Sequence, residues 1–212
     1  MGNTVASRAK LASGAAALGI EIDDSAQHAL LSYLALLKRW NKVYNLTAIK
    51  GDDNMLTRHL LDSLSVVSAL QGSSVIDIGS GAGLPGVPVA IAMPDMQVTL
   101  LDSNAKRCRF LRQVQAQLKL VNLSVVQKRV EEYQPAEKFD NLLSRAFSSL
   151  QVFISSSAHL LAEGGQFIAM KGAWPGDESV QPANAYRINE VVKIMVPGLP
   201  EQRHLVICKK VK

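Results

Sequence analysis

Several features that mark specialised classes of protein are missing from this chain of 212 residues. It has only two cysteines, Cys108 and Cys208, and they lack the pair spacing of a metal site, which excludes a disulfide framework and a cysteine zinc site. No apolar run approaches the roughly 20 residues that a membrane-spanning helix needs. The basic N-terminal stretch is short and interrupted by polar residues, so it predicts a helix and not a signal peptide. We therefore expect a cytoplasmic protein with no membrane segment and no metal.

Acidic residues are scarce in two stretches of the sequence, although the formal net charge is only +5. Between Ser103 and Val130 there are seven basic residues and no acid, and from Lys171 onward seven basic residues face four acids. Clustering of this kind favours a polyanionic partner such as a nucleic acid. A solvated helix face is the alternative explanation for part of the first stretch.

The hydrophobic pattern changes its period near residue 73. Before that point, Ala26–Trp40 and Leu56–Leu70 carry leucines at helical spacing, and Asp23, Asp24 and Ser25 can cap the first of these helices. After it, short apolar strands alternate with helices that begin near Gly86, Asn104, Ser148 and Asp177, which is typical of a parallel sheet covered on both faces. The expected strands are Val75–Ile78, Val98–Leu101, Leu123–Gln127, Asp140–Ser144, Gln166–Lys171, Val191–Val196 and His204–Lys209.

The first of these strands leads into the most informative stretch, Val75-Ile-Asp-Ile-Gly-Ser-Gly-Ala-Gly-Leu-Pro-Gly86. Glycine permits positive φ and lets another molecule approach the backbone closely. A strand that ends in such a loop and continues as a helix presents backbone N–H groups to a nucleotide-like ligand at the carboxyl edge of the sheet. The alternative to a ligand site is a purely structural strand–helix turn whose acidic residues are solvated.

Two ligands fit this loop. Three of its glycines match the G-x-G-x-x-G pattern of dinucleotide binding, which predicts an NAD-dependent oxidoreductase as one possibility. The carboxylate two residues before the first glycine instead favours S-adenosylmethionine, because it can bind an ammonium group that NAD lacks. The acid at the end of the next strand can accept hydrogen bonds from both ribose hydroxyls of either ligand. We predict S-adenosylmethionine at Asp77, Gly79, Gly81 and Asp102.

The last part of the chain predicts one reversal of strand direction. Glu163-Gly164-Gly165 indicates a helix end and turn before the fifth strand, and the short Pro197–Pro200 connection implies an antiparallel hairpin. The expected fold is α/β, a seven-stranded, mostly parallel, Rossmann-like sheet that resembles class I methyltransferases. Residues 1–70 would form a helical extension packed on the core, and residues 71–212 the adenosylmethionine-dependent domain.

This topology would bring four separated cations to one edge of the sheet. Arg129 follows the third strand, Arg145 follows the fourth, Lys171 ends the fifth, and Arg203 begins the reversed last strand. Together they would repel the sulfonium cation of adenosylmethionine unless an anion joined them, and RNA phosphates would supply that anion. We predict that Arg129, Lys171 and Arg203 bind RNA. The alternative is that each of these cations has a structural role and pairs with a nearby acidic residue.

The segment Asn141–Phe147 bears on which atom is methylated. It lacks the Asn-Pro-Pro-aromatic sequence of amino-group methylases, and neither cysteine falls in a strand-end loop where a C5 methylase would need it. If the acceptor atom is already nucleophilic, as guanine N7 is, catalysis requires only that the protein align the acceptor with the methyl group and provide suitable charges around them. We expect Arg145 to face the methyl-transfer gap and to hold an anion there, either the cofactor carboxylate or a phosphate. At this point small-molecule and protein acceptors stay open.

Five motifs together resemble the small-subunit ribosomal RNA guanine-N7 methyltransferases, the glucose-inhibited division protein B family. They are Asn45-Leu-Thr47, Arg58-His-Leu-Leu-Asp-Ser-Leu64, Asp77–Gly86, Ser144-Arg-Ala146 and Met170-Lys-Gly172. The resemblance implies methylation of one guanine of small-subunit ribosomal RNA. It also implies adenosylmethionine contacts at Gly79, Leu84, Val130, Glu131 and Arg145, with Val130 standing where the family usually has alanine.

Some alternatives stay open after this resemblance. His59 and Asp62 lie three apart on a predicted helix, where they can form a base relay or a polar anchor between the helical extension and the core. A non-catalytic ribosome-assembly protein that binds RNA is a further possibility. The substrate could be naked RNA, an assembly intermediate or a complete small subunit. We expect a monomer.

Overall fold

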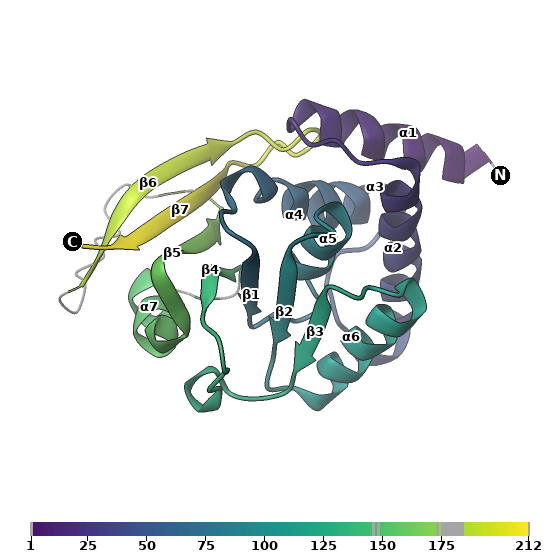
Figure 1. Ribbon diagram of the computed structural model, residues 1–212. Coiled ribbons are helices and arrows are strands. Elements are labelled where there is room, and N and C mark those ends of the chain that lie inside the picture. Colours follow the sequence, from purple (N-terminus) through teal and green to yellow (C-terminus); the bar gives the residue numbers. More distant parts are fainter. Residues whose placement is uncertain (1, 146, 148, 173, 175–184, 212) are drawn as a thin grey trace.

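A single sheet of seven strands organises the chain in its computed structural model, which describes residues 2–145, 147, 149–172, 174 and 185–211 (Figure 1). The strand order is β3-β2-β1-β4-β5-β7-β6, with β7 antiparallel to β5 and β6 and the other neighbours parallel. This confirms the predicted sheet and its C-terminal hairpin. The strands are β1 (Ser74–Ile78), β2 (Gln97–Leu101), β3 (Leu123–Val126), β4 (Phe139–Ser144), β5 (Leu161–Lys171), β6 (Tyr186–Ile194) and β7 (Arg203–Lys210).

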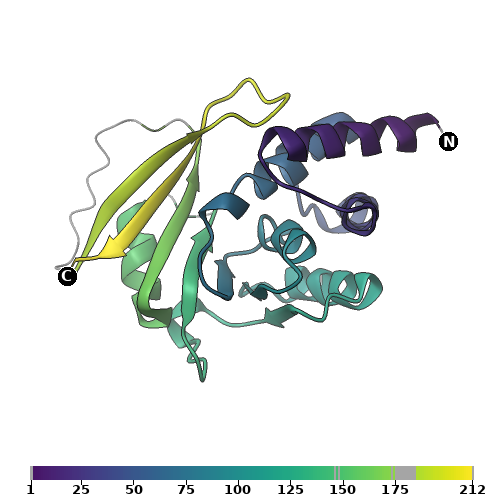
Figure 2. The ribbon, with the colours of Figure 1, turned by 45° about the horizontal axis from the view of Figure 1, so that its top comes forward.

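Helices cover both faces of this sheet, as Figures 1 and 2 show. The α-helices are α1 (Gly2–Ala17), α2 (Asp24–Tyr44), α3 (Asp52–Met55), α4 (Asp62–Leu64), α5 (Gly86–Ala92), α6 (Ala105–Leu118) and α7 (Leu150–Ser157). The predicted cap of α2 is confirmed, since the Asp23 side chain accepts from the Ala26 amide. Asn104, expected only as the approximate start of a helix, caps α6 by accepting from the amides that open it. The helix expected near Asp177 falls outside the described residues. No helix in the described ranges is both long and apolar enough to cross a membrane.

Alternating strand residues divide the core into two layers. On one face, Val75, Leu100 and Ile168 pack with α1, α2, α5 and α6 in one continuous cluster. On the other face, Ile76 and Phe167 pack with α7. Because successive side chains of a strand point to opposite faces, Asp77 lies on the same face as Val75, beneath α5.

The N-terminal helices share the larger cluster with the sheet instead of forming a core of their own. Leu11, Leu30 and Leu61 are fully buried there beside strand residues. Tyr33 of α2 is also fully buried, and its hydroxyl donates to the Ala82 carbonyl of the glycine loop at 2.7 Å. The helical segment thus supports the loop directly. The division into residues 1–70 and 71–212 stays a prediction.

Two expectations about strand starts were wrong. Glu163-Gly164-Gly165 does not end a helix, because β5 already begins at Leu161 and its register against β4 shifts between Phe139 and Asn141, with Gly164 at φ +74°. Glycine tolerates this conformation, so the irregularity sits inside the strand. β6 begins at Tyr186, five residues before the expected Val191, because its polar residues give no apolar signal.

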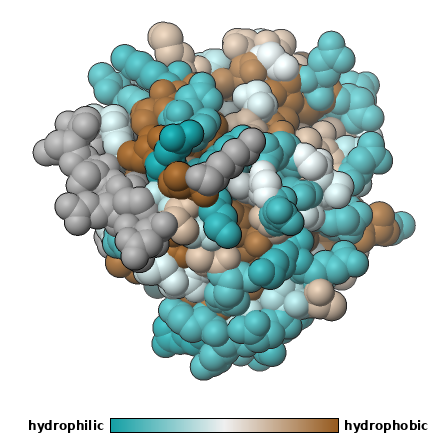
Figure 3. All heavy atoms as spheres, turned by 60° about the vertical axis from the view of Figure 1, so that its left-hand side comes forward, coloured by the Kyte–Doolittle hydropathy of each residue, from teal (hydrophilic) through white to brown (hydrophobic). Residues whose placement is uncertain are grey.

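β6 is the edge of the sheet, and its exposed side chains include Arg187, Glu190 and Lys193. The molecule seen from this side is largely hydrophilic, with hydrophobic residues scattered between (Figure 3). Charges along an edge strand oppose pairing with the edge of another sheet.

The helical stretch before β1 is irregular where it approaches the sheet. Leu56–Leu61 form a π-helix between α3 and α4, and Val67–Ala69 a 3-10 turn, whereas the leucine spacing predicts one α-helix from Leu56 to Leu70. Single π turns occur frequently at functional sites. This one contains Arg58 and His59, and both bind residues outside their own helix.

Candidate active site

The glycine loop turns sharply at the carboxyl end of β1. Gly79, Gly81 and Gly83 adopt φ of +74°, +59° and +89°, a region that residues with side chains rarely enter. The amides of Gly79 and Ser80 both donate to the Leu101 carbonyl at the end of β2, at 2.8 and 3.2 Å. The loop is therefore fastened to the adjacent strand end, as expected for a ligand site at this edge.

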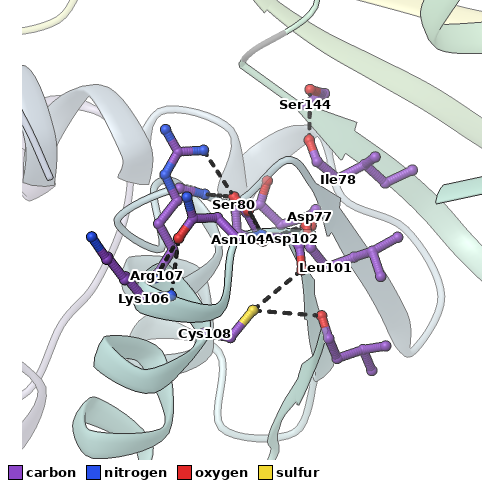
Figure 4. A network of polar contacts seen from close by, with 12 residues as sticks. Asp77, Ile78, Ser80, Leu101, Asp102, Asn104, Lys106, Arg107, Cys108 and Ser144 are labelled. Carbon is purple, nitrogen blue, oxygen red and sulfur yellow. Dashed lines mark hydrogen bonds and ion pairs between the residues drawn. The ribbon is translucent and has the colours of Figure 1, made fainter. Parts of the chain in front are cut away.

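Asp102 follows β2 and fixes the same loop from the other side (Figure 4). Its Oδ2 accepts from the Gly81 amide at 2.9 Å and from the Arg107 guanidinium at 3.3 Å, and its Oδ1 accepts from the Asn104 amide at 2.8 Å. A carboxylate offers about four acceptor positions, so one remains for a hydroxyl of a bound ribose. The buried carboxylate is thus both a loop anchor and a possible ligand contact.

Asp77 is the second acid at this site, and it is almost completely buried at the end of β1. Its Oδ2 accepts from the Gly86 amide at 3.0 Å, but its Oδ1 is buried without a partner among the described residues. Burial raises the pKa of this carboxyl to about 7, against the opposing effects of the Gly86 amide and Arg145. The orphaned oxygen is an acceptor that a ligand's ammonium group can satisfy.

Two cavities meet at this edge of the sheet, separated by Gly79 and Arg107, which line both. The Asp102 cavity has a volume of about 250 Å³, and its other lining residues include Lys128, Arg129, Val130, Glu131 and Phe147. The Arg145 cavity has a volume of about 260 Å³, and its other lining residues include Leu46, Thr47, His59, Gly81, Leu84 and Arg145. A larger cavity of about 810 Å³ between α1, α5 and the end of α6 is mainly aliphatic and lies away from the glycine loop.

The cavities contain most of the residues that the sequence predicts for the cofactor. Asp102, Val130 and Glu131 line one, Gly81, Leu84 and Arg145 the other, and Gly79 both. Asp77 lines neither and lies beneath α5. The sequence analysis missed Thr47 and Arg107 as lining residues; Arg107 lies within the first basic stretch, part of which fitted a solvated helix face.

Arg145 and Arg203 share one buried acid. Asp62 is 4% exposed, and its Oδ2 lies 3.2 Å from the Arg145 guanidinium while its Oδ1 accepts from Arg203 Nε at 2.8 Å. Arg145 also lies 3.4 Å from the Arg58 carbonyl. The anion expected beside Arg145 was the cofactor carboxylate or a phosphate, whereas the structure places the Asp62 side chain there. This arrangement supports the polar-anchor interpretation of Asp62, since the acid joins the ends of α4, β4 and β7.

His59 has a different partner from Asp62. Its Nε2 lies 2.9 Å from Thr47 Oγ1, and its Nδ1 is buried without a partner in the described part of the chain. Burial, with the positive charge of Arg145, lowers the pKa of His59 to about 4. The imidazole is thus neutral at physiological pH, which limits the electrostatic repulsion between it and Arg145.

The other predicted RNA-binding residues lie at the same edge. Arg129 is exposed on the rim of the Asp102 cavity, and Lys171 at the end of β5 pairs in register with His204, next to Arg203. Their contact with RNA stays a prediction. Neither Cys108 nor Cys208 lines the two cavities; both thiols are buried, and Cys108 donates to the Asp102 carbonyl. Among the described residues, no cluster of His, Cys, Asp or Glu could hold a metal ion.

Replacing Gly81 by valine should strongly weaken ligand binding without unfolding the protein. A Cβ at this position meets no atom closer than the Gly79 carbonyl oxygen at 3.8 Å, so the side chain would project into the Arg145 cavity while the φ of +59° adds strain. We expect calorimetry to show at least a tenfold loss of S-adenosylmethionine affinity. Gly164→Val, at a similar φ but away from the cavities, is the strain control, and equal affinities for Gly81→Val and the wild type would misplace the site.

Comparison with known proteins gives a consistent result for the sequence. Residues 26–206 match the family model described as rRNA small subunit methyltransferase G. The ribosomal RNA small subunit methyltransferase G of Chromobacterium violaceum is 50% identical over 199 residues, which cover 93% of this chain and 95% of that protein. The protein of the same name from Stutzerimonas stutzeri is 51% identical over 203 residues, which cover 95% of this chain and 94% of that protein.

Similar solved structures have the same fold at low sequence identity. A predicted O-methyltransferase from Agrobacterium tumefaciens has a TM-score of 0.57 and 22% identity, covering 72% of this chain and 80% of its own. A ribosomal protein L11 methylase from Lactobacillus delbrueckii subsp. bulgaricus has a TM-score of 0.55 and 16% identity, covering 77% and 81%. At these identities the similarity establishes the class I methyltransferase fold alone.

Proposed function

Because the chain belongs to the rRNA small subunit methyltransferase G family, we propose that it transfers a methyl group from S-adenosylmethionine to N7 of one guanine in small-subunit ribosomal RNA. The observation that carries this proposal is the pair of cavities on either side of Gly79, together with the buried oxygen of nearby Asp77 that has no partner among the described residues. Neither an NAD-dependent oxidoreductase nor a non-catalytic assembly protein finds support in the comparisons. A cytoplasmic location and a monomeric state stay predictions.

The cavities divide the expected cofactor contacts between them. Asp102 would accept from the ribose in one cavity, beside the Val130–Glu131 backbone that would meet the adenine. Asp77 and the glycine loop would bind the amino-acid part near the other. When bound, S-adenosylmethionine supplies a methyl group on a sulfonium, which a free lone pair can accept without a general base.

The acceptor side of the site fits a ring nitrogen better than a carbon or an amine. Neither cysteine lines either cavity, so no thiol is placed to activate a pyrimidine carbon. A guanine methylated at N7 carries a positive charge, and an unpaired guanidinium beside it would oppose the reaction. Asp62 is a counter-ion shared by Arg145 and Arg203 and offsets part of their combined charge, so Arg145 can orient the acceptor at a smaller electrostatic penalty.

The test of this function is a direct product analysis. The purified protein would be incubated with methyl-labelled S-adenosylmethionine and with either protein-free small-subunit RNA or isolated small subunits. Nucleoside mass spectrometry should show 7-methylguanosine at one position. Label in another nucleoside, or in a ribosomal protein, would overturn the proposed acceptor, and a difference between the two substrates would identify which form the enzyme recognises.

A further inference from the structure

A second basic region lies on the N-terminal helical segment, outside the predicted RNA-binding residues. Residues 38–50 contain four basic residues and no acid, and they form the end of α2 and the loop that follows. All four basic side chains are exposed. Lys38 pairs with Asp52, but in the described part of the chain Lys42 and Lys50 take part in no ion pair.

These residues surround a hollow of about 720 Å³ and do not project from a flat helix face. Its lining consists of Lys38, Asn41, Lys42, Asn45, Thr47, Ala48 and Lys50. Apart from one alanine, every lining residue has a polar side chain, and none is acidic. Lysines at the end of a helix also offset its dipole, which accounts for Lys42 but not for Lys50, since Lys50 lies beyond the helix.

The hollow and the Arg145 cavity are adjacent, and hydrogen-bonded residues form the wall between them. Asn41 binds the backbone of Thr47 twice, through its Nδ2 to the carbonyl at 2.9 Å and its Oδ1 to the amide at 2.8 Å. Thr47 lines both the hollow and the cavity, and its hydroxyl contacts His59. The wall between them is therefore held in a defined conformation.

We propose that this basic hollow binds backbone phosphates of the RNA segment that flanks the methylated nucleotide, an inference that rests on the proposed function. A nucleotide whose base enters the Arg145 cavity has chain on both sides of it. Arg203 is connected through Asp62 to Arg145 in the cavity wall, whereas Lys42 and Lys50 line the hollow that shares Thr47 with the cavity, so both flanks of the nucleotide would meet cations. Asn41 and Asn45 carry amide groups of the kind that contact phosphate and sugar oxygens without reading sequence.

The salt dependence of RNA binding tests this proposal. For the double variant Lys42→Ala/Lys50→Ala, the plot of log affinity against log salt should become shallower by about 0.7 for each lysine, the value for single-stranded nucleic acid. S-adenosylmethionine affinity and the methylation rate at saturating RNA should match the wild type, while KM for RNA rises. Lys138→Ala is the matched control because Lys138 is exposed before β4, at the opposite end of the sheet.

The outcomes separate this proposal from the proposed function. If the wild type methylates ribosomal RNA but the double variant keeps its salt slope, the hollow does not bind phosphate and the function stands. If the double variant loses affinity only for intact subunits and not for protein-free RNA, the partner is an acidic protein surface and the RNA proposal is wrong. If the wild type transfers no methyl group to RNA, the proposed function itself fails. Retention of wild-type slope by Lys42→Arg/Lys50→Arg would confirm that charge is the relevant property.

Discussion

Replacing Asp62 by asparagine should slow methyl transfer at saturating RNA by about 100-fold, the scale that misplacing a catalytic group by an ångström produces. Asp62 holds Arg145 at 3.2 Å and Arg203 at 2.8 Å, and it neutralises much of their charge. Asparagine keeps the shape but leaves two guanidinium groups without a counter-ion beside the reacting ring. Single-turnover kinetics would measure the rate separately from binding.

The same substitution should lower the free energy of unfolding by about 1–3 kcal/mol, less than for a fully buried pair because both arginines keep some solvent contact. Asp53→Asn is the matched control, since Asp53 pairs with Lys10 at the surface and should change neither quantity appreciably. Combined with Arg145→Lys, the rate effect of Asp62→Asn should be less than additive, because both changes disturb one contact. Fully additive effects would mean that Asp62 does not position Arg145.

Replacing Asp77 by asparagine should stabilise the ligand-free protein at pH 8 while weakening S-adenosylmethionine binding by tenfold or more, the scale of one charged hydrogen bond. The pKa of Asp77 is about 7 in the folded protein against an ordinary value of 3.8. Between these values the folded protein retains a proton that the unfolded chain has lost, so stability falls as the pH rises through this window. The neutral amide removes this loss, which is on the order of a few kcal/mol.

Thermal unfolding of both proteins from pH 4 to 8 would check this prediction. The difference in stability should grow as the pH rises toward 7 and then level off. The amide oxygen of asparagine can still accept from Gly86, so the loop should keep its conformation. A constant difference across the range would show that Asp77 is ionised in the folded protein well below pH 7, and that the carboxylate has a partner other than a bound ligand.

The sequence predicted which residues meet at the carboxyl edge of β1 and β2, because the signals are local. The glycine spacing, Asp77 within β1 and Asp102 after β2 all lie within a few residues of a strand end, and a parallel sheet brings such ends together. The shared acid was not predictable in this way. Asp62 lies 83 residues from Arg145 and 141 from Arg203, so pairing them requires the tertiary structure.

Hydrophobic periodicity also failed at particular elements for identifiable reasons. Tyr186 and Ile188 of the edge strand β6 pack against the core, but the register shifts between Ile188 and Glu190 and the next three residues are exposed, so the alternation is too short to mark the start of the strand. The π turn of Leu56–Leu61 keeps the leucine spacing of an ordinary helix, because a single extra residue changes the periodicity little. Nothing in the local sequence distinguishes Thr47 from other loop threonines, because its contacts with Asn41 and His59 form only in the tertiary structure.

Because β7 lies between β5 and β6, the sheet cannot be completed until this last strand has been synthesised. β5 and β6 leave the ribosome first, but neither pairs with the other, and both await the strand that is translated after them. Arg203, at the beginning of that strand, also supplies the second cation for Asp62, which was translated 141 residues earlier. A nascent chain that ends before residue 203 has its glycine loop but not its finished catalytic edge. We therefore expect no methyltransferase activity from a nascent chain before β7 has been synthesised.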